Sequence, residues 1–342
     1  MGYALDNKAF ASVCSQWSKT HDIYGPMVFE GTGRFSETDV VRYGKVTDPS
    51  QLVWNAQSDY SFKDILTPIC QVLFYFTEHS VQEAELSERG VIVFLRSCDL
   101  HAVKRLDYMF LQHGPEDYYY KQARDRIKFV LIGCDHSFEE CFCVSMGTNK
   151  SDNYDCAINV REGSFEVDCK DEFLGKALQE YGTEIGVVTP DSVTEDPIPV
   201  HIPENLTSEV AKSSIWDEYD KRCINCGRCT LVCPSCTCWS MQDIFYTENG
   251  NAGERRRIQT SCMFNDYTVV AGGGRFRQKP GERMRFKVLH KVLEFKKGAG
   301  YNMCVGCGRC DAICPEYISI KHIFVRNIFP LSIASTKNYR KA

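Results

Sequence analysis

The chain has 342 residues, a length that suggests two domains, and 43% of them are hydrophobic, enough to bury a sizeable core. Its net charge of −5 is modest for this size, so we expect neither a nucleic-acid partner nor a membrane surface. Residues Met1 to Phe10 lack the basic and apolar segments of a signal peptide, and no apolar run approaches the roughly 18 residues of a membrane helix. We therefore expect a cytoplasmic protein without a membrane span.

The N-terminal half shows the pattern of an α/β or α+β domain. Two continuous apolar runs, VIVFL at 91–95 and FVLIG at 129–133, predict buried strands. Between them, residues 99–112 carry apolar side chains near helical spacing, with Asp99 placed as the N-cap. The order strand, helix, strand predicts a parallel βαβ unit.

Further along, residues 158–168 predict a hairpin that turns at Glu162-Gly163, and residues 173–181 predict a short helix. The regular patterns then end at residue 187. Four prolines follow among Thr, Ser, Asp and Glu: Pro190, Pro197, Pro199 and Pro203. This composition predicts a linker at 187–215 between an N-terminal domain at 1–186 and a C-terminal domain at 216–342.

The chain has 19 cysteines, which in a reducing compartment indicate metal ligands rather than disulfides. Two segments share one cysteine motif: CINCGRCTLVCP at 223–234 and CVGCGRCDAICP at 304–315. Each reads C-x2-C-x2-C-x3-C-P, the pattern of ferredoxins that hold two [4Fe–4S] clusters. Three of the cysteines bind one cluster, and the fourth, followed by proline, reaches the other. Glycines inside the motifs let the backbone turn around the sulfurs: Gly227, Gly306 and Gly308.

The expected ligation is therefore crossed between the two motifs. The first cluster takes Cys223, Cys226, Cys229 and Cys314, and the second takes Cys304, Cys307, Cys310 and Cys233. Paired zinc knuckles are the alternative, but these more often use C-x2-C pairs across a long gap or include histidine. The motifs predict a ferredoxin-like, mainly helical C-terminal domain with two [4Fe–4S] clusters and a long insertion.

The insertion, 70 residues at 234–303, is rich in basic side chains. They are Arg255, Arg256, Arg257, Arg275, Arg277, Arg283, Arg285, Lys287 and Lys291. Two interpretations stay open: a solvated face or counter-charge for anionic clusters, or a docking surface for an acidic or redox partner. Nucleic-acid binding is less favoured, because no binding module accompanies the arginines. Three further cysteines of the insertion are interpreted as buried thiols around the clusters rather than ligands: Cys236, Cys238 and Cys262.

Four cysteines of the N-terminal half follow the two predicted parallel strands: Cys98, Cys134, Cys141 and Cys143. The carboxyl ends of parallel neighbours lie side by side, at the edge where α/β sheets place their ligands. A helix N-terminus at Asp99 would favour a negatively charged group there. Buried core cysteines are the alternative, but four at one edge favour a third [4Fe–4S] cluster. The remaining cysteines are interpreted as structural: Cys14, Cys70, Cys156 and Cys169.

Other motifs of catalysis are not evident in the sequence. No G-x-G-x-x-G follows a strand and no Walker motif occurs, and the glycine run 272–274 reads as a loop. His101 and His113 read as surface or core residues. We find no convincing nucleophile–base pair, so we predict no catalytic residue on this chain and one-electron transfer as its chemistry.

With these motifs, the chain closely resembles the A subunit of anaerobic sulfite reductase over nearly its whole length. The resemblance lies in GRFSETD, PICQVLFYF, RSCDLHAVKRLDYMFL, CFCVSMGTNK, RCINCGRCTLVCPSCTCWS, GERRR, KPGERMRFKVLHK and MCVGCGRCDAICP. The chain is more distantly similar to the β subunit of cytoplasmic sulfur-reducing hydrogenases. Those relatives often have proline where this chain has Ser97, which mildly favours the sulfite reductase.

The resemblance implies a subunit of an oxidoreductase complex. A flavin- and NADH-binding B subunit would supply electrons, this chain would relay them, and a sirohaem C subunit would reduce sulfite to sulfide. The alternative that it implies is the iron–sulfur relay subunit of a cytoplasmic sulfhydrogenase or sulfur reductase. A zinc-binding scaffold without a redox role is the hypothesis from another class of protein.

Overall fold

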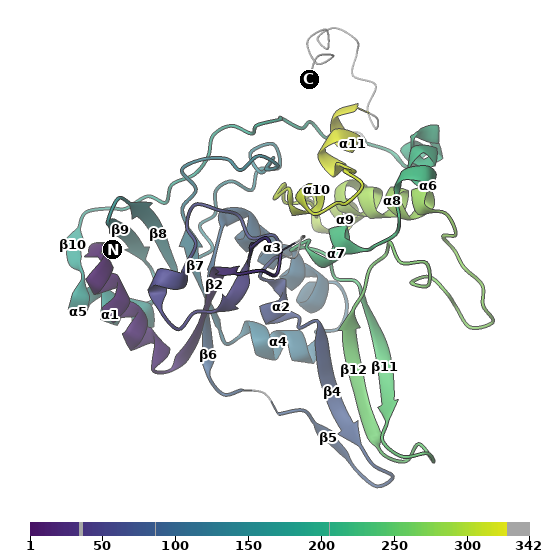
Figure 1. Cartoon of the computed structure of the whole chain (residues 1–342), viewed down its shortest axis with the longest axis horizontal. Helices are drawn as coiled ribbons and strands as arrows, with labels where there is room; N and C mark the ends of the chain where they lie inside the picture. Colours follow the sequence, from purple (N-terminus) through teal and green to yellow (C-terminus); the bar gives the residue numbers. More distant parts are fainter. Residues whose placement is uncertain (34–36, 86, 205, 327–342) are drawn as a thin grey trace, which may run out of the picture.

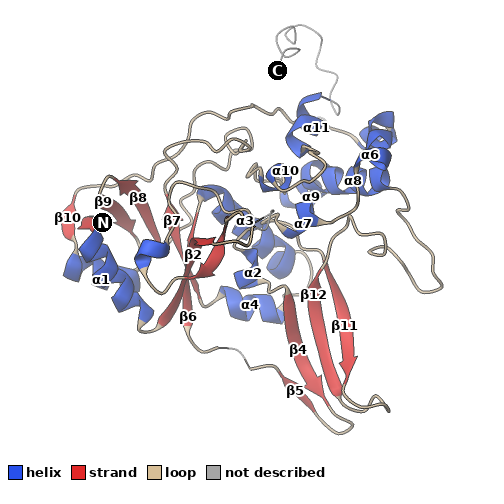
Figure 2. Ribbon diagram, in the orientation of Figure 1, coloured by secondary structure: helices blue, strands red, loops and turns tan. Residues whose placement is uncertain are grey.

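The computed structural model describes residues 1–33, 37–85, 87–204 and 206–326, so the end of the predicted C-terminal domain, 327–342, lies outside the described residues. Eight strands form one mixed sheet in the order β10-β1-β9-β8-β7-β6-β2-β3 (Figures 1 and 2). The bounds of its strands are β1 Gly2–Asp6, β2 His21–Phe29, β3 Val40–Lys45, β6 Gly90–Leu95, β7 Ile127–Ile132, β8 Cys156–Arg161, β9 Ser164–Cys169 and β10 Thr183–Ile185. The four central strands β2, β6, β7 and β8 are parallel, and the outer pairings are antiparallel.

Helices cover both faces of this sheet. Ile92 and Phe94 of β6 pack with α1 (Asn7–Ser18) and α5 (Glu172–Tyr181). Val93 and Leu95 point the other way, towards α2 (Lys63–Leu66), α3 (Ser97–Asp107) and α4 (Tyr118–Arg124). A strand buried on both faces reads as a continuous apolar run, which is why this one was evident in the sequence.

The predicted βαβ unit is confirmed, and one detail of it was wrong. Strands β6 and β7 pair in parallel with α3 between them. The helix begins at Ser97 with Arg96 as its N-cap, and a π-helical turn, Tyr108–Gln112, extends it. Asp99 is therefore not the N-cap. It lies fully buried in the first turn, where its carboxylate binds a distant arginine.

The hairpin and the short helix expected at 158–181 are confirmed as β8, β9 and α5, with the turn at Glu162 and Gly163. The proline-rich stretch from 187 to 207 has no helix or strand among its described residues. It is nevertheless packed against both parts of the molecule. Val193 is buried in the same core as α3, Val200 is buried among side chains of the C-terminal part, and the Asp196 carboxylate accepts hydrogen bonds from two backbone N–H groups just after Cys143.

A second sheet of four antiparallel strands projects from the body of the molecule (Figure 1). Its order is β11-β12-β4-β5, with β4 Cys70–Phe76, β5 Val81–Glu83, β11 Trp239–Phe245 and β12 Gly253–Gln259. The C-terminal part is therefore not mainly helical, because the insertion supplies half of this sheet. Strand β12 pairs with β4 of the N-terminal half, so the two predicted domains share a sheet, and their boundaries stay a prediction.

Short helices make up the rest of the C-terminal part. They are α6 Glu218–Arg222, α7 Arg228–Leu231, α8 Pro280–Leu289, α9 Phe295–Ala299, α10 Arg309–Ala312 and α11 Ile320–Arg326, with a π-helical turn at His290–Glu294. Two 3-10 turns, Ser208–Lys212 and Ser214–Asp217, precede α6, and a third, Pro49–Gln51, lies in the N-terminal half. Their apolar side chains form a third core around Val288 and Phe324. Among the described residues, no helix is both long and apolar enough to cross a membrane.

Candidate iron–sulfur sites

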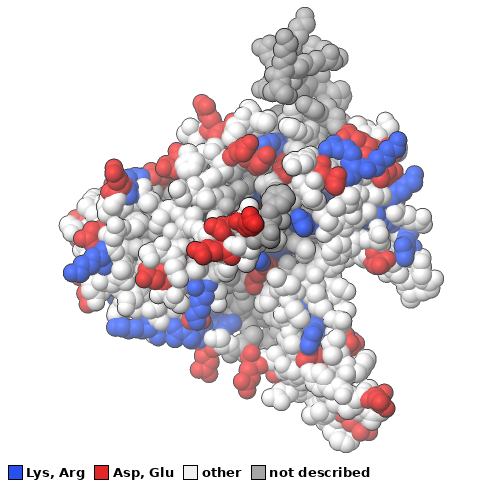
Figure 3. Space-filling model, in the orientation of Figure 1, with Lys and Arg blue, Asp and Glu red and all other residues white. Residues whose placement is uncertain are grey.

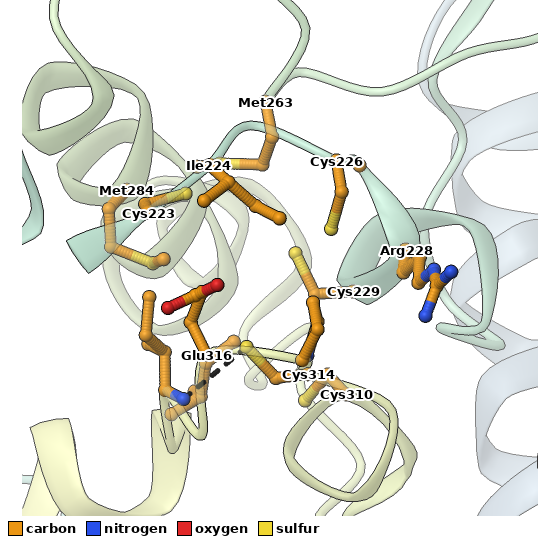
Figure 4. Close-up of a pocket in the computed structure, with 14 residues that line it drawn as sticks. Cys223, Ile224, Cys226, Arg228, Cys229, Met263, Met284, Cys310, Cys314 and Glu316 are labelled. Carbon is orange, nitrogen blue, oxygen red and sulfur yellow. Dashed lines mark hydrogen bonds between the residues drawn. The ribbon is translucent and has the colours of Figure 1, made fainter. Parts of the chain in front are cut away.

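The four cysteines predicted for the first cluster line one cavity: Cys223, Cys226, Cys229 and Cys314. Their sulfurs surround a common space (Figure 4). Gly227 has a φ of 73° and starts α7, so the chain can reverse between the second and third cysteines. Met263 and Met284 add apolar walls, and the Ile318 N–H donates to Cys314 Sγ at 3.3 Å. Cys310 of the predicted second set also lines this cavity, so it offers five thiols, of which a [4Fe–4S] cluster requires four.

The second set is brought together by the repeated motif: Cys304, Cys307, Cys310 and Cys233. Burial raises the pKa of all three motif cysteines, and the nearby Cys233 raises each of them further. Gly308 repeats the role of Gly227, with a φ of 73° at the start of α10. Cys233 thus lies near the three cysteines of the second motif, as a crossed ligation would require, and the ligation itself stays a prediction.

The four N-terminal cysteines also line a single cavity: Cys98, Cys134, Cys141 and Cys143. As expected, this cavity lies at the carboxyl ends of β6 and β7. Arg96 Nη1 donates to Cys134 Sγ at 3.3 Å, and Gln57 Nε2 donates to Cys141 Sγ at 3.7 Å. Such donors stabilise thiolate ligands, whereas burial, followed by the nearby Cys307, raises the pKa of Cys141 to about 12.

Sequence reasoning missed Arg96 and Gln57. Arg96 directly precedes the cysteine-bearing helix, and its place beside Cys98 in the chain could have marked it. Gln57 lies in a loop with no motif around it, so no local signal could have revealed it.

The second and third sites are in direct contact. Cys141 Sγ lies 3.8 Å from the carbonyl oxygen of Cys307, and Gln57 donates to that same oxygen at 2.8 Å. The Phe142 N–H donates to the carbonyl oxygen of Gly306 at 2.8 Å. Single hydrogen bonds therefore separate the second cysteine set from the third.

A buried ion pair also joins the second and third sites. The Arg309 guanidinium donates to both carboxylate oxygens of Asp99, at 2.7 and 2.9 Å. Arg309 lies between Cys307 and Cys310, and Asp99 follows Cys98. The ion pair therefore links the third cysteine set, through Cys98, to the second set, through Cys307 and Cys310.

The basic residues of the insertion fall into two groups, one in ion pairs around the second sheet and one buried near the cysteines. Arg255 and Arg257 form ion pairs with Asp243 and Asp117 around the second sheet. Lysines and arginines on the face in Figure 3 are interspersed with acidic side chains rather than gathered in one patch. By contrast, Lys287 is buried, and its Nζ donates to the carbonyl oxygen of Cys229 at 3.0 Å. The counter-charge interpretation thus fits the buried lysines, and partner docking stays a hypothesis.

Lys291 gives a test of this counter-charge. It is 4% exposed, and although burial opposes its charge, the cysteines around it, Cys233 first, raise the pKa of Lys291 above its usual value. A cluster gains negative charge on reduction, which the ammonium stabilises. We expect Lys291→Met to lower the reduction potential of the second cluster by on the order of 100 mV. Potentiometric EPR measures this shift.

The control is Lys297→Met, since Lys297 is 58% exposed and pairs with Glu294. Its charge is screened by solvent, so the potential should stay within the error of wild type. Equal potentials in both variants would contradict a role for Lys291.

The other cysteines are placed as follows. Cys236 and Cys262 are buried, as interpreted, and Cys238 is half-buried. Cys14 lies in the core against the eight-stranded sheet, whereas Cys70 is exposed on β4. Cys156 and Cys169 are cross-strand partners, with their sulfurs 2.6 Å apart.

Within the part of the chain that the structure describes, no three His, Cys, Asp or Glu side chains are grouped to hold a single metal ion. Four ligands of one zinc ion crowd around it at about 2.3 Å. Ligands of a cubane stand farther apart, because each thiolate binds a different iron.

Comparisons with known proteins agree with this donor set. Residues 222–318 match a family described as 4Fe-4S dicluster domain. Sulfhydrogenase 2 subunit beta from Pyrococcus furiosus is 28% identical over 340 residues, which cover 94% of this chain and 96% of that protein. No solved structure matches. The chain is thus a homologue of this sulfhydrogenase subunit, and its C-terminal third carries a 4Fe-4S dicluster domain.

Proposed function

We propose that this chain is the electron-relay subunit of a cytoplasmic oxidoreductase complex and holds three [4Fe–4S] clusters. The observation that carries the proposal is the gathering of 12 cysteines into three sets of four. They are Cys223, Cys226, Cys229 and Cys314; Cys304, Cys307, Cys310 and Cys233; and Cys98, Cys134, Cys141 and Cys143.

Clusters bound in these sites would supply one-electron transfer. The chain's own residues hold the thiolates and control their surroundings. Apolar side chains such as Met263 and Met284 keep water away from the first site. Lys287, Lys291 and Arg96 place positive charge beside the sulfurs, which stabilises the anionic state. Burial, charge and hydrogen bonds to sulfur are the levers that set the potential of such a group.

The identity of the complex has two candidates. Near full-length similarity to a sulfhydrogenase subunit favours a hydrogenase-type partner. The resemblance in the segments from GRFSETD to MCVGCGRCDAICP favours a sulfite reductase, with a flavin- and NADH-binding B subunit and a sirohaem C subunit. Both assign this chain the same relay role, and neither requires a catalytic residue on it.

Anaerobic affinity purification of the tagged chain from its native cells separates the two candidates. Co-purified nickel identifies a hydrogenase partner by metal analysis. Sirohaem and flavin identify a sulfite reductase by their absorption spectra. Sulfite turnover by the isolated chain would contradict the relay role in either complex.

Iron content tests the number of clusters. We expect about 12 irons and about 12 acid-labile sulfides per chain in anaerobically prepared protein. Cys98→Ala removes one ligand of the third site and should reduce both numbers to about eight, because the dicluster motifs remain. Iron and sulfide assays with EPR of the reduced protein measure this.

Cys70→Ser is the matched control, since Cys70 is exposed and belongs to none of the three cysteine sets. Its iron content should equal that of wild type. About eight irons in wild type would remove the third cluster, and zinc without sulfide would overturn the proposal.

A further inference from the structure

Cys238 and Cys262 lie at the base of one hairpin. Cys238 directly precedes β11, and Cys262 follows the end of β12. These strands pair with Trp239 opposite Gln259, and the Thr260 N–H donates to the carbonyl oxygen of Cys238 at 3.0 Å. The antiparallel pairing therefore brings the two thiols together, and their side chains are hydrogen-bonded.

The pair lines a further cavity, about 560 Å³ in volume. Cys236, Cys238 and Cys262 form part of its wall, and Tyr267, Lys287 and His290 form another part. Cys238 is half-buried, whereas Cys262 is 3% exposed. A more accessible thiol backed by a buried one is the arrangement of an attacking and a resolving cysteine.

Cys238 is also the more acidic of the two thiols. The hydrogen bond from the Cys262 thiol, the Cys262 backbone N–H, the Lys287 charge and the Tyr267 hydroxyl together lower the pKa of Cys238 to about 6, against the opposing effect of burial. The same hydrogen bond raises the pKa of Cys262. Cys238 is thus the nucleophile at neutral pH.

Residues of this cavity wall contact both dicluster sites: Cys262 lies near the first set, and Cys236 lies near the second. Cys262 Sγ lies 3.8 Å from Thr230 Oγ1, which follows Cys229 of the first set. Cys236, on the same cavity wall, is hydrogen-bonded to Cys233 of the second set. Neither Cys238 nor Cys262 belongs to a ligand set, so both are free for other chemistry.

We propose that Cys238 and Cys262 are a redox-active dithiol that reduces a small disulfide compound bound in this cavity. The inference rests on the proposed relay function, because the clusters are the source of its electrons. It adds a two-electron step to a chain whose clusters move electrons singly.

The reaction balances as thiol–disulfide exchange. The Cys238 thiolate attacks one sulfur of the compound, breaks its S–S bond and releases one thiolate, which leaves a mixed disulfide on Cys238. Cys262 then loses its proton and attacks Cys238 Sγ, which releases the second thiolate and forms the Cys238–Cys262 disulfide. Two electrons, one from each dicluster site, and one proton restore the Cys238 thiolate and the Cys262 thiol. The two released thiolates take up two protons, one of which replaces the proton that Cys262 lost, so the cycle consumes two electrons and two protons in all.

The test uses the full chain, prepared anaerobically and assayed for iron. Protein with its thiols reduced and its clusters oxidised is treated with bis(2-hydroxyethyl) disulfide, its remaining thiols are capped, and its peptides are mapped by mass spectrometry beside an untreated sample. We expect a peptide that links Cys238 to Cys262. Peptide mapping separates it from any link between the neighbouring Cys156 and Cys169.

Variants trap the intermediate and count the electrons. Cys262→Ser should accumulate a hydroxyethylthio group on Cys238, whereas Cys238→Ser should accumulate none on Cys262. In a dithionite titration, the treated wild type should take up two more electrons than treated Cys238→Ser. The exposed Cys70→Ser should behave as wild type in both assays.

Each result has one meaning. Full iron without a linked peptide overturns the dithiol but leaves the relay intact. Loss of iron in Cys238→Ser identifies Cys238 as a ligand and also overturns the dithiol. Protein without iron or sulfide contradicts the proposed relay itself.

Discussion

Replacing Gly308 with alanine is expected to lower the iron content from about 12 to about four per chain. Gly308 has a φ of 73°, and a Cβ there would meet the carbonyl oxygen of Glu140 at 2.2 Å. That oxygen belongs to backbone, which must move, and the next residue is Cys141 of the third set. The added methyl group therefore pushes the backbone before Cys141 away from the second motif, which distorts both the second and the third cysteine sets. Iron and sulfide assays of anaerobic protein measure the loss.

Gly300→Ala is the matched control for this variant. Gly300 also has a positive φ, 82°, but a Cβ there would meet nothing within 4 Å. Both substitutions carry the cost of a left-handed alanine, about 1 kcal/mol, and only Gly308→Ala adds the backbone clash. Full iron content in Gly308→Ala would show that the second and third sites do not depend on the close contact between Gly308 and the Glu140 backbone.

The cysteine sets could be predicted because local rules govern them. The repeated motif specifies its own turn through glycine, as Gly227 and Gly308 show. The third set was predictable for a different reason. Once β6 and β7 are parallel neighbours, residues just after them must meet at one edge, which brings Cys98 and Cys134 together.

The second sheet could not be predicted because its partners are distant in the chain. Strand β12, GERRRIQ, is too charged to read as a strand by its apolar pattern. Its arginines are accommodated by acidic partners: Arg255 by Asp243 across the hairpin and Arg257 by Asp117 from the N-terminal half. Pairing with β4 then completes a sheet that neither half encodes alone.

Asp99 is a single residue whose position could not be predicted, again because its partner is distant in the chain. An aspartate before an amphipathic run is a sound N-cap by local rules. Its actual partner is Arg309, 210 residues away, and no short-range pattern predicts that contact. The helix instead starts two residues earlier, and Asp99 becomes part of the junction between cluster sites.

Arg309→Met is expected to destabilise the protein by about 3–5 kcal/mol, because it leaves the Asp99 carboxylate buried without its partner. Arg309 is 2% exposed and Asp99 is fully buried. Methionine fills much of the space of the arginine stem but donates no hydrogen bond. The denaturant midpoint for loss of the visible cluster absorbance, with the m-value, measures the change.

Arg255→Met is the control, because Arg255 makes a similar two-contact pair with Asp243 on the surface, where its side chain is 43% exposed. Exposed pairs contribute about 0–1 kcal/mol, so this variant should stay near wild type. The double variant Asp99→Leu/Arg309→Met removes both charges and should recover most of the loss, since the cost lies in the unpaired charge rather than in the missing contact. If the two single variants were equally stable, Asp99 and Arg309 would not fasten the sites. If the double variant were no better than Arg309→Met, the cost would lie in packing around Arg309 instead.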